Sequence, residues 1–157
     1  MGAIAVHPDL GRLADLLGDW EGEGRGQWGD GGVFEYREWL HFGHTGKPFV
    51  AYAQRTAAAD DGRPLHSESG YWRAVVDGVE LAVAHSTGVV EIATGRWEGA
   101  VLRLRPHAMR TSPTAKAVTA LERDFEIDGD TLRYTLRMTR DESPPRWHLS
   151  AALARVG

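Results

Sequence analysis

The chain has 157 residues, enough for one domain that buries about two-thirds of its unfolded surface. A hydrophobic fraction of 42%, a charged fraction of 25% and a net charge of −4 with scattered basic residues argue against a nucleic-acid-binding face. The lack of cysteine excludes disulfides, thiolate metal sites and a cysteine nucleophile.

The N-terminal segment leads into a short predicted helix. Residues 1–8 lack the basic start and the apolar length of a signal peptide, and no segment approaches membrane-spanning length, so we expect a cytoplasmic protein that contacts no membrane. Over residues 8–17, leucines at positions 10, 13, 16 and 17 share one helical face, and Gly18 supplies a stop signal. We expect this single helix to cap or plug a fold made of strands.

Glycine then occupies positions 18, 22, 24 and 26, and Trp20 takes the remaining alternate position of this segment. The segment is not a phosphate-binding loop, because it lacks the Gly-Lys-Ser/Thr ending and a following helix. In strand geometry its glycines, Gly22 and Gly24 among them, share one face that another backbone, a side chain or a flat ligand can approach closely. A sharply bent barrel strand and a ligand-binding strand are both consistent with this pattern.

Alternation of apolar and polar residues with period two dominates the remaining sequence. It is clearest over residues 131–138, where Leu132, Tyr134, Leu136 and Met138 face one way and threonines and arginines face the other. With hairpin signals such as Asp77-Gly78 between them, the predicted strands cover residues 18–26, 33–42, 49–56, 65–75, 79–85, 89–94, 96–105, 117–127, 131–138 and 147–153.

About ten short strands and no second helix predict an all-β fold, an antiparallel up-and-down β-barrel that forms a single domain over residues 1–157. A barrel of more than eight strands leaves room inside for a ligand. The alternative is a β-sandwich, which would bury the same faces but leave no central cavity.

Seven histidines are the unusual feature of the composition. His85 extends an apolar strand face, and Met138 ends another inward face ten residues before His148, which lies in the last strand. Inward histidine and methionine beside a hydrophobic lining suit a soft, flat metal cofactor such as haem better than a hydrated ion. Taken alone, His148 would more often be a hydrogen-bonded core residue than a metal ligand.

Other kinds of site find little support. A structural zinc site lacks a close-spaced ligand pair, and a serine hydrolase lacks the G-x-S-x-G turn. The carboxylates of residues 122–128 alternate with inward residues, so we expect them on a solvated outer face rather than in a glycosidase site. Arg123 is the odd member of the inward set, and we expect it to pair with a buried carboxylate or to meet an acidic ligand.

Several blocks of the sequence resemble the nitrobindin family, haem-binding β-barrels related in shape to fatty-acid-binding proteins. The family's G-x-W-x-G-x-G signature is complete in residues 18–24. Further blocks that resemble the family, in the same order, lie at residues 34–36, 44–49, 64–71, 84–88, 113–116 and 148–151. The resemblance therefore spans nearly the whole chain.

The resemblance implies one haem b per chain, with His148 as the iron ligand and His66 on the distal side. It implies isomerisation of peroxynitrite to nitrate, with His148 and His66 as the catalytic residues, and reversible binding of nitric oxide; a homodimer is left open. The residues expected to contact the cofactor, besides these two histidines, are His85, Met138, Leu65, Trp28, Asp30, Gly22 and Gly24.

One segment departs from the family pattern. Where many members have Tyr-Pro-Thr-Ile, this chain has Trp28-Gly29-Asp30-Gly31, which removes a threonine contact to the porphyrin and adds a negative charge near its propionates. Either haem is held more weakly, or Trp28 and the loop backbone contact it differently. The alternative function is a haem-free barrel that binds a fatty acid or another small apolar ligand, whose carboxylate Arg123 could receive.

Overall fold

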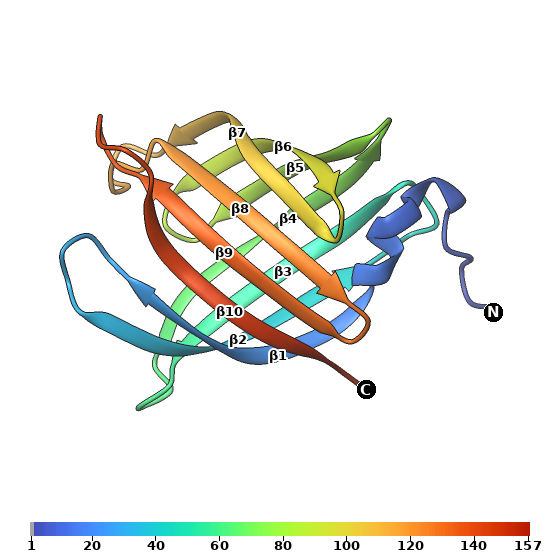
Figure 1. Ribbon diagram of the computed structural model, residues 1–157, viewed down its shortest axis with the longest axis horizontal. Coiled ribbons are helices and arrows are strands. Elements are labelled where there is room, and N and C mark those ends of the chain that lie inside the picture. Colours follow the sequence, from blue (N-terminus) through green and yellow to red (C-terminus); the bar gives the residue numbers. More distant parts are fainter. Residues whose placement is uncertain (1) are drawn as a thin grey trace.

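The computed structural model describes residues 2–157 and forms a closed antiparallel barrel (Figure 1). Each strand pairs with its neighbours in the chain, and β1 closes the barrel by pairing with β10. The predicted ten-stranded up-and-down barrel is confirmed, and the sandwich alternative is wrong. The strands are β1 (Gly18–Gln27), β2 (Val33–Gly43), β3 (Phe49–Ala58), β4 (Pro64–Val75), β5 (Gly78–His85), β6 (Val89–Glu98), β7 (Val101–Thr111), β8 (Ala120–Asp128), β9 (Thr131–Thr139) and β10 (Arg146–Val156).

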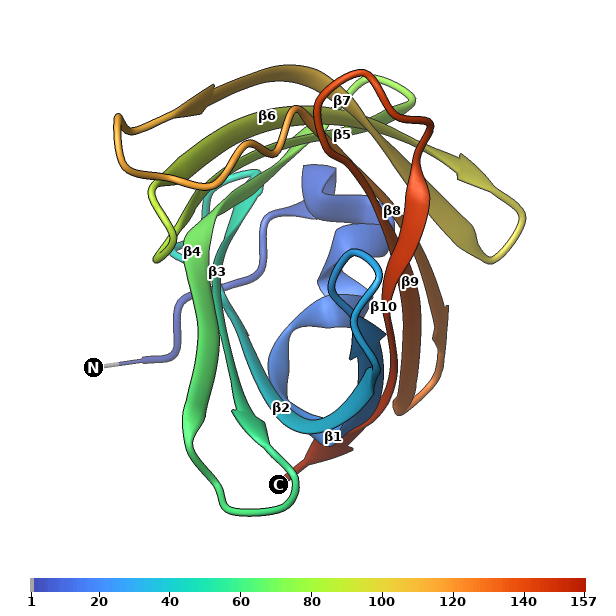
Figure 2. The same cartoon turned by 90° about the vertical axis from the view of Figure 1, so that its left-hand side faces the viewer.

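The predicted helix exists as a 3₁₀ helix, η1 (Pro8–Leu16), interrupted by the non-helical backbone of Gly11 at φ 52° and ψ −128°. Leu10, Leu13 and Leu16 are buried at three-residue spacing, which matches the three residues per turn of a 3₁₀ helix. Figure 2 shows η1 at the end of the barrel away from the viewer, where its leucines join the core and plug that end. At nine residues η1 is far shorter than the about 20 that a membrane-spanning helix needs, and the described residues contain no candidate membrane helix.

The glycines of β1 let the barrel close tightly. Gly22 and Gly24 lie on the inner face, where a Cβ atom on Gly22 would overlap the backbone of β10 at Ala152, and one on Gly24 would overlap the ring of Tyr36. Neighbouring protein atoms therefore occupy the space that these glycines leave. This agrees with a sharply bent strand rather than with a face open to a ligand.

One predicted turn is wrong. The sequence predicts that Gly95 separates two strands, but β6 runs through it and the chain turns at Gly99 instead, where φ is 59°. The missing side chain of Gly95 makes room for Leu104 on the neighbouring strand β7. Gly95 therefore allows close packing inside the barrel and does not form a turn.

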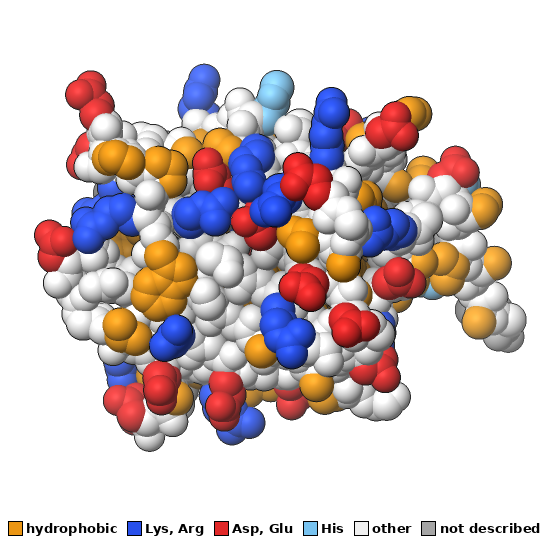
Figure 3. Space-filling view, in the orientation of Figure 1, with side chains coloured by type: hydrophobic (Ala, Val, Ile, Leu, Met, Phe, Trp, Pro, Cys, Tyr) orange, Lys and Arg blue, Asp and Glu red, His pale blue; other side chains and the backbone are white. Residues whose placement is uncertain are grey.

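The outer face of β8 carries the carboxylates that the alternation placed there. Figure 3 shows positive and negative side chains interspersed on this side of the molecule. Asp124 accepts from Arg105 at 2.9 Å and lies 3.2 Å from Arg103, both of β7, and Glu122 accepts from Arg137 of β9 at 3.0 Å. These carboxylates are engaged in surface ion pairs, as a solvated face requires.

Candidate functional site

A cavity of about 1110 Å³ lies inside the barrel, and none of its lining residues belongs to η1. Ordinary small-molecule pockets measure about 300–1,000 Å³, so this one can hold a large ligand. Six of the predicted contact residues line it: Trp28, Leu65, His66, His85, Met138 and His148. The remaining three predicted contacts, Gly22, Gly24 and Asp30, are not among its lining residues.

A bulge in β10 turns His148 into the cavity. Along β10, Leu153 and Ala151 are buried, so strict alternation would point His148 outward. The register between β10 and β9 shifts between Trp147 and Leu149, and this irregularity lets His148 and Leu149 both line the cavity. Bulges commonly redirect a side chain in this way next to functional sites.

The imidazole of His148 is held with one nitrogen available. Its Nδ1 lies 2.8 Å from the carbonyl oxygen of Gln27, to which it donates, so the neutral ring keeps a lone pair on Nε2. Burial lowers the pKa of His148 below its usual value, against a smaller opposite effect of the bond to Gln27. Trp28 packs edge-to-face against the ring, with centroids 5.6 Å apart. His148 is therefore a neutral imidazole of fixed orientation, which can offer the lone pair of Nε2 to a ligand in the cavity.

The loop that departs from the family pattern is neutralised by basic side chains. Asp30 is exposed and pairs with Arg146 at 3.1 Å. Lys116 Nζ lies 4.6 Å and Arg140 Cζ lies 4.7 Å from the centroid of the Trp28 ring. Asp30 is thus paired with an arginine that does not line the cavity. Within this loop, Trp28 forms the wall of the cavity.

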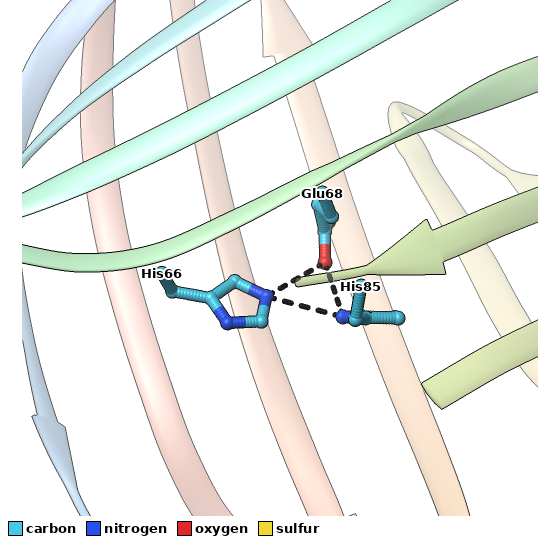
Figure 4. A group of neighbouring side chains, drawn as sticks. All are labelled: His66, Glu68 and His85. Carbon is cyan, nitrogen blue, oxygen red and sulfur yellow. Dashed lines mark hydrogen bonds and ion pairs between the residues drawn. The ribbon is translucent and has the colours of Figure 1, made fainter. Parts of the chain in front are cut away.

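A cluster of polar side chains lies on the wall formed by β4 and β5 (Figure 4). Glu68 is paired in register with His85 on the adjacent strand, and His66 lies two residues from Glu68 on the same face. Glu68 Oε2 lies 2.9 Å from His85 Nδ1 and 3.3 Å from His66 Nε2. The two ring nitrogens are 3.1 Å apart. Strand register therefore brings His85 to two groups that are distant from it in the sequence.

Buried charges from the next strands complete this cluster. His85 Nε2 bonds to Glu91, and Arg123 donates to both oxygens of Glu91 and lies 3.7 Å from Glu68. Burial alone would raise the pKa of Glu68, but the charge of Arg123 and bonds from the histidines hold it well below its usual value. Burial would also lower the pKa of His85, but its two carboxylate partners raise it to about 9. The prediction that Arg123 pairs with a buried carboxylate is confirmed.

A second polar group in the cavity surrounds Glu38. Its Oε2 accepts from Gln54 at 2.6 Å and from the hydroxyl of Tyr134 at 3.0 Å, while its Oε1 has no partner among residues 2–157. Burial raises the pKa of Glu38 to about 8, and the negative charge of Glu68 adds to this, against the two hydrogen bonds. At neutral pH Glu38 is therefore an uncharged carboxylic acid.

This state of Glu38 predicts a pH-dependent stability. Because its pKa is about 8 in the folded protein and 4.5 for an unperturbed glutamate, its contribution is fully present at low pH and is lost as the pH rises through 8. At about 1.4 kcal/mol per pKa unit, the loss between pH 5 and pH 9 is on the order of 4 kcal/mol. Urea unfolding of wild type and Glu38→Gln across this range should show a larger loss in the wild type, because other groups with a shifted pKa, such as His85, titrate in both proteins. Parallel pH profiles would contradict it.

Sequence reasoning missed Glu38, Gln54, Glu68 and Glu91. For three of them the signal was present in the alternation, since each lies two residues from a buried apolar residue on its own strand: Leu40 for Glu38, Tyr52 for Gln54, and Val89 and Ala93 for Glu91. A polar residue within an inward-facing set predicts a buried polar contact, as Arg123 did. Which of these residues meet could only follow from the strand register.

Fold and cavity define the class: a closed antiparallel β-barrel with an internal ligand cavity and a histidine presented to it. Residues 9–155 match the model of the family described as the THAP4-like, heme-binding beta-barrel domain. The chain therefore belongs to this family, the nitrobindin-type haem-binding barrels that the sequence blocks resembled.

Individual relatives agree with this assignment. The chain is 48% identical over 159 residues to a peroxynitrite isomerase of Nocardia farcinica, with 98% of this chain and 94% of the relative covered. It is 46% identical over 155 residues to peroxynitrite isomerase 2 of Mycobacterium avium, with 96% of each covered. The crystal structure of Rv2717c from M. tuberculosis matches with a TM-score of 0.90 at 43% identity, over 98% of this chain and all of that one.

Proposed function

We propose that the cavity binds one haem b per chain through His148, and that the protein isomerises peroxynitrite to nitrate. The observation that carries this proposal is the placement of His148, whose Nε2 is available to the cavity while Nδ1 is fixed by the Gln27 carbonyl. The names of the relatives as peroxynitrite isomerases support the reaction.

The residues of the cavity fit a haem group. Histidines that bind metals usually donate their second ring N–H to a carbonyl or carboxylate, which fixes the tautomer, and His148 has this arrangement. Its lowered pKa keeps the nitrogen free of a proton at neutral pH. Leu65, Met138 and Trp28 offer apolar surface to a flat ring system. Lys116, which also lines the cavity, offers a positive charge to a propionate.

When bound, haem would supply an iron centre that can bind a small oxidised nitrogen species. The chain's own residues would orient and enclose that species. His66 lines the same cavity from β4, so its ring can donate a hydrogen bond to a bound anion. Met138 and Leu65 would limit the entry of water and keep reacting fragments together. Nitric oxide binding at the same position is part of the proposal, as is action in the cytoplasm.

The alternative function is a haem-free barrel that binds a fatty acid, and Arg123 was expected to bind the carboxylate of that ligand. A fatty-acid carboxylate would need a free cationic side chain, and Arg123 already binds Glu91 through two nitrogens and lies 3.7 Å from Glu68. A third carboxylate at this point would meet two others. Arg123 is therefore not available as the anchor that the sequence analysis assigned to a fatty-acid carboxylate.

The proposed reaction can be tested by stopped flow on the haemin-reconstituted protein. At equal haem concentration, we expect peroxynitrite to decay faster, and with a higher nitrate yield, than with free haemin. The haem-free protein serves as the control and should leave the decay unchanged. A decay no faster than that with free haemin would exclude the isomerase function and leave haem binding to be judged separately.

A further inference from the structure

Three metal-ligand atoms converge on one point of the cavity wall, on the side away from His148. In the closed barrel, β5 is five strands from β10 in either direction, so His85 and His148 belong to opposite walls. Figure 4 shows His66, Glu68 and His85 with His66 Nε2, Glu68 Oε2 and His85 Nδ1 directed at one another. Their separations are 2.9, 3.1 and 3.3 Å.

These separations are those of atoms that share a metal ion. Zinc lies about 2.0–2.2 Å from imidazole nitrogen and carboxylate oxygen, so two such ligands are about 3.0–3.4 Å apart at bond angles between right and tetrahedral. The three separations span nearly this range. No movement of backbone is needed to place an ion in contact with all three atoms.

The surrounding groups hold two of the three ligands, His85 and Glu68, as metal sites require. His85 bonds through its other nitrogen, Nε2, to Glu91, which is in turn fixed by Arg123. The second oxygen of Glu68, Oε1, accepts from the hydroxyl of Tyr52 at 2.7 Å. Hydrogen bonds of this kind on the far side of ligating histidines and carboxylates orient them and are typical of metal sites.

Without an ion, a single proton on His85 Nδ1 is shared between Glu68 Oε2, at 2.9 Å, and His66 Nε2, at 3.1 Å. Glu68 Oε2 only accepts, and each facing ring nitrogen carries at most one proton. With two protons, the N–H groups of His66 and His85 oppose each other at 3.1 Å. With one proton on His85, the lone pair of His66 faces the Glu68 oxygen at 3.3 Å. A cation at the centre turns all three contacts into attractions.

The charge of the cluster requires one more positive charge than Arg123 supplies. Glu68 and Glu91 carry two negative charges against the one positive charge of Arg123, and all three side chains are buried, at 3–7% exposure. An unbalanced negative charge inside a protein is costly, so the cluster holds either a proton on His85, between its two carboxylate partners, or a bound cation in place of that proton.

We propose that His66, Glu68 and His85 form a second metal site, which binds one divalent first-row transition-metal ion such as Zn²⁺. Two imidazoles and one carboxylate are the ligand set of catalytic zinc sites and of non-haem iron sites, both of which keep open positions. All three residues line the cavity, so the open positions face its interior. The site could not be recognised from ligand spacing in the sequence, because the second histidine, His85, reaches the other two ligands only through the pairing of β4 with β5.

The test is titration of the full-length, haem-free, chelator-treated protein with Zn²⁺ by calorimetry, and with Co²⁺ by visible absorption. We expect one ion per chain and Co²⁺ bands of a low-coordinate site. His66→Ala and Glu68→Gln should each weaken binding at least about 100-fold, since even changes beyond the ligands cost 10–100-fold. His66 is half-buried and lines a cavity, so its replacement leaves folding intact, which circular dichroism checks.

Two matched variants separate this site from the haem site. His148→Ala should keep full affinity for Zn²⁺, because His148 lies on the opposite wall, and His41→Ala, which removes an exposed histidine of β2, should also keep it. Absence of saturable one-to-one binding by the wild type would overturn the proposal, whatever the variants do. So would Zn²⁺ binding that survives Glu68→Gln and His66→Ala, or that is lost with His148.

Discussion

Replacement of His148 by alanine is expected to lower the affinity for haemin at least about 100-fold and to shift the Soret band towards that of free haemin. The physical reason is that Nε2 of His148 is already oriented towards the cavity by the β10 bulge and the Gln27 carbonyl. Alanine would leave only the apolar contacts of the cavity and the charge of Lys116 to hold the haemin. Absorbance titration of the purified protein with haemin measures both effects.

A control and a rescue make this result specific. His41→Ala removes an exposed histidine on the outside of β2, where the pair with Asp19 contributes little, and should leave the titration unchanged. Added imidazole should restore the spectrum of His148→Ala, because it can enter the space that the ring occupied. Equal haemin affinity of His148→Ala and wild type would mean that the iron ligand lies elsewhere.

Removal of Arg123 is expected to cause the largest loss of stability. Arg123 is buried and donates to both oxygens of Glu91, so Arg123→Met leaves Glu91 and the nearby Glu68 without their guanidinium partner. Breaking a buried pair in this way costs about 3–5 kcal/mol. Urea unfolding at neutral pH measures the loss.

The matched control is Arg103→Met, which removes a half-exposed arginine that pairs with Glu98 and Asp124 on the outer surface. Exposed pairs contribute little to stability, so this variant should unfold close to the wild type. Adding Glu91→Gln to Arg123→Met should recover part of the stability, because it removes one unpaired charge. A loss below about 1 kcal/mol in Arg123→Met would contradict the buried network.

The strands could be predicted because one face of each is buried. On β9, for example, Leu132, Tyr134, Leu136 and Met138 are all buried, and their alternation was plain in the sequence. The type of helix could not be predicted from its leucines, since the left-handed-type φ of Gly11 breaks the α-helical period. Likewise, glycine is a residue type typical of turns, but Gly95 packs against leucines in the core of the barrel.

The candidate site was predictable only in part, for a geometric reason. Alternation assigns each residue to a face, which was enough for His85, Met138 and Arg123. It says nothing about which residue on the next strand lies opposite, so the meeting of Glu68 and His85 required the register. For His148 alternation gives the wrong face, because a bulge adds one residue; its inward direction was indicated by the family resemblance.

The pairing of β1 with β10 has a consequence for how the protein matures during synthesis. β10 both closes the barrel and carries His148, so a nascent chain that ends before residue 146 has two unpaired sheet edges, on β1 and β9, and lacks His148. Unpaired edges invite association with other chains. Protection of these two edges and the proposed haem ligand therefore depend on the synthesis of the same strand, β10.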